Sequence, residues 1–140
     1  MSGEANTVIV CRMFEEIFNH GKLALVETWV ATTFLNHAAP VHMLRGLESL
    51  KEHVILLRIA FPDLHFTVEA LIADEERVAV RVTFRDTHRG VFRGFPPTNK
   101  TFVRTQMHIV RFVKGKAVEH WTVRNELSLM QQIGILPSSG

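Results

Sequence analysis

Apolar positions in the first part of the chain recur at helical spacing. Val10, Phe14, Ile17 and Phe18 fall three or four residues apart, so they share one face of a predicted helix that ends at Asn19-His20-Gly21. The same pattern predicts two further helices, and proline ends the second of them. The short one runs through Leu23, Val26 and Trp29, an extended polar connection spans Asn36 to Pro40, and the long one carries Leu47, Leu50, Val54 and Leu57 before Phe61-Pro62-Asp63.

After Asp63 the apolar period changes to two, which is typical of strands. Two hairpins and a closing helix are predicted: HFTVEALIA and RVAVRVTFRDTH around Asp74-Glu75-Glu76, then TFVRTQMHIVRFV and a strand ending at Asn125, then a helix with Leu127, Met130 and Ile133 that stops at Gly134. Helices followed by antiparallel strands indicate one α+β domain over residues 1–140. Long strands curl, so we expect a cone-shaped, half-open barrel whose curved antiparallel sheet wraps the N-terminal helices around an internal pocket.

The last hairpin carries the candidate chemistry. Val113-Lys114-Gly115 reads as a three-residue loop closed by a left-handed glycine, which pairs Phe112 with Lys116. A two-residue turn would shift the pairing by one residue and split the polar set between the two faces. With the longer loop, four polar side chains project from one side as two facing pairs: His108 opposite His120, and Gln106 opposite Thr122.

The other face of this hairpin is apolar, with Met107, Ile109, Trp121 and Val123. The free side of an antiparallel sheet is normally polar, so a cover is expected there. We predict a homodimer through this sheet face. The alternative is that the C-terminal tail folds back over it.

Composition limits the classes of partner that we expect for this protein. The chain has 140 residues, 16 basic and 14 acidic ones, a net charge of +2 and one cysteine. No basic run or recognition helix points to nucleic acid, and no apolar run is long enough for a membrane span. The N-terminus lacks the pattern of a secretory signal, so a cytoplasmic location is expected.

Several segments together resemble the SnoaL-like polyketide cyclase family of the nuclear transport factor 2-like superfamily. They are FNHGKL, FLNHAAP, FPDL, RVAVRVTFRDTHRGVFRGFPPTNK, KGKAVEHW and LMQQIG, in this order over nearly the whole domain. The resemblance implies an intramolecular aldol ring closure in which an acid near the end of the last strand acts as acid and base. It also implies that Asn36, Gln106, His108 and His120 line the pocket.

The acid that the resemblance implies is missing. Its position holds Thr122, and the place where many relatives carry another acid holds Asn125. A hydroxyl cannot replace a carboxylate as proton acceptor without a stronger base beside it. The resemblance therefore supports a pocket of the family type more strongly than it supports the family's aldol chemistry.

Two functions from different classes remain open. In the first, His108 and His120 act as a catalytic pair on a small hydrophobic, carbonyl-bearing ligand held by Asn36, Gln106 and Thr122, in a cofactor-free aldol cyclisation or related proton transfer. In the second, the histidines only satisfy their polar neighbours, and the chain is a binding or dimerisation module. His37 and His42 lack the spacing and companions of a metal site, so no metal is expected.

Overall fold

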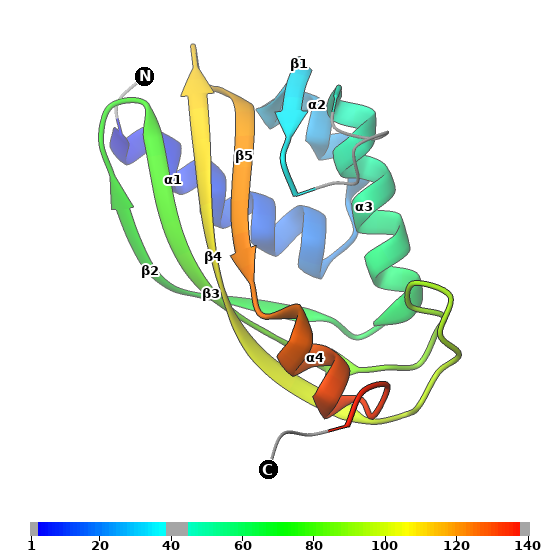
Figure 1. Cartoon of the computed structure of the whole chain (residues 1–140). Coiled ribbons are helices and arrows are strands. Elements are labelled where there is room, and N and C mark those ends of the chain that lie inside the picture. The colour runs from blue at the N-terminus through cyan, green and yellow to red at the C-terminus, as the bar shows by residue number, and fades with distance from the viewer. Residues whose placement is uncertain (1–2, 39–44, 138–140) are drawn as a thin grey trace.

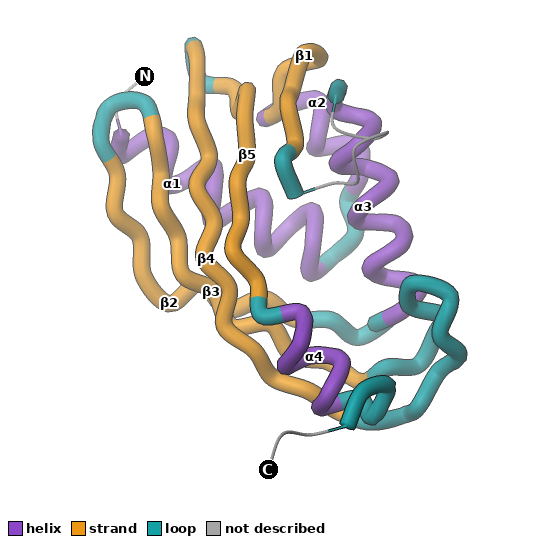
Figure 2. Tube along the Cα trace, in the orientation of Figure 1, coloured by secondary structure: helices purple, strands orange, loops and turns teal. Residues whose placement is uncertain are grey.

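The computed structural model describes residues 3–38 and 45–137. Its strands form one curved sheet in the order β1-β5-β4-β3-β2 (Figures 1 and 2). The strands are β1 (Val30–Asn36), β2 (His65–Ala73), β3 (Arg77–Thr87), β4 (Thr101–Val113) and β5 (Lys116–Arg124). The helical segments are α1 (Gly3–Arg12), η1 (Met13–Asn19), η2 (Leu23–Leu25), α2 (Val26–Trp29), α3 (Leu47–Ala60) and α4 (Glu126–Gln132). The predicted α+β class and half-open curved sheet are confirmed.

The helices lie on the concave side of the sheet. In Figure 2, α1 passes behind the curved strands, α3 lies to their right beyond β1, and α4 lies at the lower end of β4. α1 contacts β2 and β3, η1 contacts β2, and α3 contacts β1. Because the sheet does not close, the space between it and these helices is lined by the side chains that the helices and strands turn inward.

The first helix ends where the sequence predicts, and its second half is widened. Residues 13–19 form a π-helical segment, and Gly21 follows with a left-handed φ of 70°. Asn19 then joins this end to the sheet: its Nδ2 donates to the carbonyl of Phe66 (3.0 Å), and its Oδ1 accepts from the amide of Phe66 (2.7 Å). Arg58 on α3 donates to the carbonyls of Phe18 and Asn19 at 2.8 and 2.9 Å. These bonds satisfy carbonyls at the helix end and fix η1 between sheet and α3.

Strand β1 is an addition to the expected fold. The sequence predicted an extended connection from Asn36 onward, whereas the strand already begins at Val30 and ends at Asn36. It runs parallel to β5, with Val30 beside Ala117 and Asn36 beside His120. The sheet is therefore mixed, and the expectation of a purely antiparallel one is wrong. Residues 39 and 40 of the predicted connection and His42 lie outside the described residues.

The first hairpin agrees with the sequence. β2 and β3 pair antiparallel around residues 74–76. Oδ1 of Asp74 accepts from the backbone amides of Glu76 (2.8 Å) and Arg77 (2.7 Å). Such a side-chain bond replaces the backbone bonds lost in the turn, which is why aspartate suits this position.

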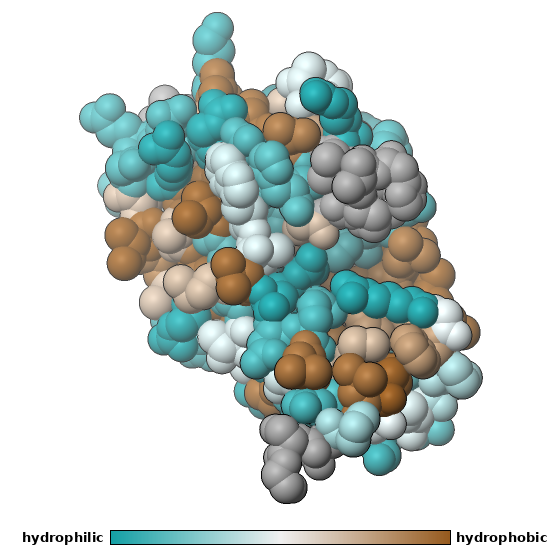
Figure 3. Space-filling view, in the orientation of Figure 1, coloured by the Kyte–Doolittle hydropathy of each residue, from teal (hydrophilic) through white to brown (hydrophobic). Residues whose placement is uncertain are grey.

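The outer face of the sheet is partly apolar, as predicted. Met107, Ile109 and Val123 are 48%, 42% and 76% exposed. Trp121 is only partly covered, by His37, whose ring stacks on it at 5.2 Å. Figure 3 shows brown apolar side chains between teal polar ones over this side of the molecule. None of the helices in the described part of the chain has the length and apolar character to span a membrane.

Candidate active site

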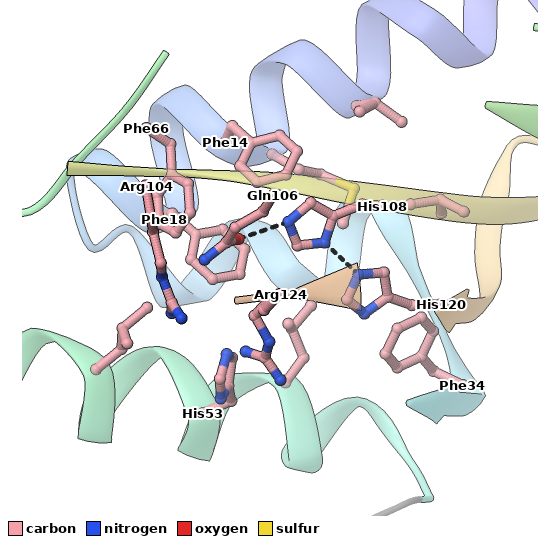
Figure 4. Close-up of a pocket in the computed structure, with 15 residues that line it drawn as sticks. Phe14, Phe18, Phe34, His53, Phe66, Arg104, Gln106, His108, His120 and Arg124 are labelled. Atoms are coloured by element: carbon pink, nitrogen blue, oxygen red, sulfur yellow. Dashed lines mark hydrogen bonds between the residues drawn. The ribbon is translucent and has the colours of Figure 1, made fainter. Parts of the chain in front are cut away.

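The candidate site is an inner cavity between the concave face of the sheet and the helices. It has about 40 Å³ of space for the centres of water-sized molecules, which on that measure is room for about three waters. Its walls are mostly aromatic and aliphatic, and its polar groups come from the sheet and from α3 (Figure 4). Lining side chains include Val10, Met13, Phe14, Phe18, Phe34, Leu50, Leu57, Phe66 and Val110, with His53, Arg104, Gln106, His108, His120 and Arg124.

The turn between β4 and β5 differs from the predicted loop. Lys114 and Gly115 both have positive φ, 52° and 78°, as in a two-residue type I′ turn. Val113 therefore pairs with Lys116, and Phe112 pairs with Ala117. The three-residue loop is wrong because Lys114, a non-glycine residue, also adopts the left-handed conformation.

A bulge then restores the face of the polar residues. The pairing moves by one residue between Phe112 and Arg111, so that Arg111 faces Glu119. The turn and the bulge each shift the pairing by one residue, and together they preserve which side chains share a face. The predicted common face is thus confirmed, while both predicted facing pairs are wrong. The observed pairs are Val110 with His120, His108 with Thr122, and Gln106 with Arg124.

His108 and His120 meet diagonally across the two strands. Their rings stack at 5.1 Å, and Nδ1 of His108 lies 2.8 Å from Nε2 of His120. Nε2 of His108 is 2.7 Å from Oε1 of Gln106, and Nδ1 of His120 is 3.0 Å from Oδ1 of Asn36. Figure 4 shows the first two of these bonds along the cavity wall. The four residues form one continuous hydrogen-bonded chain.

The proton positions in this chain follow from its far end. Oδ1 of Asn36 also accepts from the amide of Ala38 (3.0 Å), so Nδ1–H of His120 donates to it and Nε2 of His120 keeps a lone pair. Nδ1–H of His108 fills that lone pair when both rings are neutral. Nε2 of His108 then needs a donor, so the amide of Gln106 must present its NH2 group. If Oε1 of Gln106 faces Nε2 of His108 instead, that nitrogen must carry a hydrogen, and the histidine pair then holds one extra proton.

Burial makes both rings hard to charge. Desolvation, followed by the charges of His53 and Arg124, lowers the pKa of His120 to about 3. Desolvation, followed by the charge of His120, lowers the pKa of His108 well below its usual value. Because the charged form of an imidazole is disfavoured in an apolar environment, both rings are neutral near pH 7.

The structure places the predicted ligand-binding residues Asn36 and Thr122 differently. Asn36 is fully buried at the end of β1 and bonds to His120, but it is not among the residues that line the inner cavity, so it lies behind the histidine pair and not at the cavity surface as expected. The hydroxyl of Thr122 donates to the carbonyl of Met107 (2.9 Å), and Thr122 does not line the inner cavity. Asn125 caps α4, where its Oδ1 accepts from the amide of Ser128. The two positions that resemble acid positions thus serve the backbone.

His53 on α3 was not foreseen. Its ring faces the sheet residues from across the cavity (Figure 4), with Phe18 at 6.3 Å. Desolvation, followed by the charges of Arg124 and Arg93, lowers the pKa of His53 to about 4. The sequence did contain a signal, since His53 follows Leu50 by three residues and therefore shares its helical face.

Arg104 and Arg124, also not foreseen, stand where the inner cavity opens into a second space. This outer vestibule has about 420 Å³ on the same measure. Arg104, Arg124, His53 and Leu57 line both spaces. We call Arg104 and Arg124 the arginine neck, because they are the arginines that line both spaces.

The described residues that line the inner cavity include no aspartate or glutamate. Residues 3–38 and 45–137 also contain no cluster of three or more His, Cys, Asp or Glu side chains that could hold a metal ion. The bases that the described residues offer at the histidine end of the cavity are therefore the imidazoles, and the side-chain amides there serve only as hydrogen-bond partners.

The fold and this site define a class of protein: a cone-shaped α+β domain whose inner cavity ends at a chain of histidines and amides. The family model of the SnoaL-like polyketide cyclase matches residues 8–133. The chain belongs to this family, so the resemblance predicted from the sequence is confirmed.

Characterised relatives match over most of the chain. It is 30% identical over 128 residues to the aklanonic acid methyl ester cyclases DauD of Streptomyces sp. (strain C5) and DnrD of Streptomyces peucetius. The matches cover 88% of this chain in both cases, with 78% of DauD and 87% of DnrD. The solved structure of AclR from Streptomyces galilaeus is 28% identical, with a TM-score of 0.84 over 99% of this chain and 87% of AclR.

Proposed function

We propose that this protein binds a small hydrophobic, carbonyl-bearing polyketide and closes a ring in it by a cofactor-free aldol reaction. The observation that carries the proposal is the hydrogen-bonded pair of His108 and His120 in a cavity whose walls are mostly aromatic and aliphatic. A positioned base beside an apolar binding surface is the arrangement that proton abstraction next to a carbonyl needs.

In the proposed reaction, Nε2 of His108 takes a proton from a carbon next to a carbonyl after the amide of Gln106 turns away. The electron pair left on that carbon forms the new carbon–carbon bond to a second carbonyl, whose oxygen becomes an alkoxide. The proton then passes from His108 to this oxygen, so no atom is lost and the pair returns to its first state. Nε2 of His120 accepts from Nδ1–H of His108 throughout. This bond orients the His108 ring so that its own Nε2 faces the ligand.

The low pKa of both rings makes the pair a weak base toward a neutral ligand. The enolate that forms carries a negative charge inside the cavity, and this charge stabilises the imidazolium more strongly than it would in water. Abstraction is therefore favoured only where the enolate is held against the pair. This dependence suits carbons that lie between two carbonyls, because their protons are the most acidic.

Turnover of aklanonic acid methyl ester, the compound named for DauD and DnrD, tests the proposal. His108→Ala should lower the rate of ring closure about 10²–10⁴-fold, the usual contribution of general acid–base catalysis. His65→Ala, an exposed histidine at the start of β2, is the matched control and should keep the rate of the parent. Equal rates in His108→Ala, His120→Ala and the parent would exclude the histidine mechanism.

A binding module is the second candidate. The absence of a carboxylate from the described lining of the inner cavity and the backbone bond of Thr122 favour it. Micromolar binding of the same ester by the parent protein, with no ring closure over hours, would select this function over catalysis.

We also propose that the protein is a homodimer through the outer face of the sheet. The exposed side chains of Met107, Ile109 and Val123 support this, because contiguous apolar surface usually marks an interface. Light scattering after gel filtration should give the dimer mass for the parent and for Val8→Lys on α1, and the monomer mass for Ile109→Lys. A monomeric parent at micromolar concentration would contradict the proposal.

A further inference from the structure

The arginine neck places two permanent charges in a buried position. The side chains of Arg104 and Arg124 are 4% and 15% exposed, and Figure 4 shows both reaching from the sheet toward His53 on α3. Desolvation lowers the pKa of both guanidinium groups, yet arginine stays charged at any physiological pH. The wall that the inner cavity shares with the vestibule is therefore positively charged.

This charge is only partly balanced. Apart from the histidines, the ionisable residues in the described lining of the two spaces are Arg93, Arg104, Arg124 and Glu126. Oε1 of Glu126 lies 3.2 Å from Nη1 of Arg104 and 3.7 Å from Nε of Arg124, and its Oε2 lies 3.2 Å from Nη2 of Arg93. His53 is neutral near pH 7. Three guanidinium groups thus share one carboxylate, which leaves two positive charges in the described lining.

The hydrogen bonds at the neck do not by themselves call for a ligand. Among the described residues, Nε of Arg104 is a buried donor without a partner, and Oε2 of Glu126 is a buried acceptor without one. These two groups are of opposite kinds and can be satisfied together. The charge is different, because a buried charge without full compensation is costly and no further carboxylate stands in the described lining. Negative charge that forms in the cavity would be stabilised there.

The charge of Arg124 reaches the histidines. After desolvation by burial, it contributes to the lowered pKa of His53, His108 and His120. A field that disfavours an imidazolium favours an anion at the same place. The ring closure proposed above starts from a neutral ligand and forms an enolate in this cavity. The interaction with the neck would therefore become stronger as the reaction proceeds, which is the requirement for catalysis.

We propose that the arginine neck binds the carbonyl oxygen next to the reacting carbon and stabilises the negative charge that this oxygen gains in the enolate. The proposal rests on the proposed ring closure and adds Arg104 and Arg124 to its catalytic residues. The C–H proton passes to Nε2 of His108. The electron pair of that bond spreads onto the oxygen until the carbon uses it to form the new carbon–carbon bond. A neutral methyl ester suits such a site, because the charge arises only during the reaction.

The register of the strands supports this contact. Arg104, Gln106 and His108 are successive inward residues of β4, about 7 Å apart, and Arg124 pairs with Gln106 from β5. A carbon held against Nε2 of His108 has its carbonyl oxygen about 2.4 Å away, and a hydrogen bond to that oxygen adds about 2.9 Å. This span covers most of the interval between the histidine and the neck once the amide of Gln106 has turned away. Because the oxygen is then nearer to the guanidinium than the imidazolium is, attraction outweighs repulsion.

A probe that can be ionised tests the proposal without turnover. 2-Hydroxyanthraquinone is a flat carbonyl compound whose hydroxyl ionises with a change of colour, and its anion shares the charge with a carbonyl as an enolate does. The vestibule offers apolar walls at Leu56, Ile59 and Phe92 for its rings. Absorbance titration should show a lowered pKa of the bound hydroxyl, because the anion binds at least about tenfold more tightly than the neutral form. Calorimetry with 2-methoxyanthraquinone, which cannot ionise, measures whether the cavity binds a neutral carbonyl compound at all.

Four variants locate the effect. Arg124→Met should reduce the preference for the anion to about threefold or less and leave the affinity for 2-methoxyanthraquinone within about threefold, whereas Arg124→Lys should keep most of the preference. Glu126→Gln should increase the preference, because it removes the carboxylate that competes for the arginines and keeps the shape of the side chain. Arg81→Met, on the exposed face of β3, is the control and should keep the preference of the parent.

Kinetics with aklanonic acid methyl ester test the catalytic role. Arg124→Met should lower kcat and kcat/KM equally, by about 10–10²-fold, with KM within about threefold of the parent. The loss is smaller than is usual for a donor to an oxyanion, because Arg104 remains. A rise of KM with unchanged kcat would overturn the catalytic role, since the contact would then form as strongly with the neutral ligand.

The outcomes separate this proposal from the proposed function. Binding of 2-methoxyanthraquinone together with equal binding of both forms of 2-hydroxyanthraquinone overturns the role of the neck and leaves the proposed cavity function standing. A preference for the anion that survives Arg124→Met and ignores Glu126→Gln also overturns it, since the neck is then not the contact. Failure of both probes to bind at millimolar concentration rejects the role of the neck together with the proposed ligand class.

Discussion

Acidification from pH 7 to pH 4.5 should destabilise this protein through its buried histidines. The pKa of His120 falls from an ordinary value of 6.5 in the unfolded chain to about 3 in the folded one. Between these values the unfolded chain binds more protons, so the free energy of unfolding falls as the pH falls. The stability is fully present above pH 6.5 and is lost as the pH drops toward 3. At pH 4.5, His120 alone should cost about 2 kcal/mol after allowance for its partial exposure.

Urea unfolding at pH 7 and pH 4.5 measures this loss, and a variant isolates it. In His120→Gln the amide can still bond to His108 and Asn36 but does not titrate. The variant should lose about 2 kcal/mol less than the parent on acidification. Val103→Ala, an exposed substitution on the outer face of β4 that removes no titratable group, is the control and should lose as much as the parent. Equal losses in His120→Gln and the parent would show that His120 is not held neutral.

The sequence predicted the elements well and the register of one hairpin poorly. Alternation along β4 correctly assigned Gln106 and His108 to the inner face, because each inward residue there is buried and each outward one except the half-buried Arg111 is exposed. The pairing partner depended on the turn and on a bulge near Arg111. A bulge has no apolar signature, and Lys114 gives no local sign of a positive φ. Which residues share a face was thus more predictable than which residues meet.

The arginine neck and His53 show a different limit. Arg104 lies two residues before Gln106, so alternation already puts it on the inner face. An arginine in that position also fits a solvated sheet face, and only the arrangement in space brings it next to Arg124 and Glu126. The same holds for Asn36, which reaches His120 because β1 joins β5 from far away in the sequence.

The second large effect, on stability, is expected for substitution of Phe84, whose ring packs between Phe66 and Arg104 of the site. Its ring is fully buried and stacks on Phe66 at 4.4 Å, with Phe61 and Phe102 at 5.7 and 5.0 Å. The guanidinium carbon of Arg104 lies 5.5 Å above the ring. Phe84→Ala removes the centre of this aromatic cluster and should lower the free energy of unfolding by about 3–5 kcal/mol.

Urea unfolding checks this value against two variants. Phe84→Leu keeps much of the volume and should cost only about 1–1.5 kcal/mol. Val103→Ala, at an outward position of β4 that is 52% exposed, should cost about 0.5 kcal/mol or less. A loss below about 1 kcal/mol for Phe84→Ala would mean that the neighbouring rings close over the gap. In that event the position of Arg104 would not depend on the Phe84 ring, and the side chains of the arginine neck would be mobile and not preorganised by the aromatic cluster.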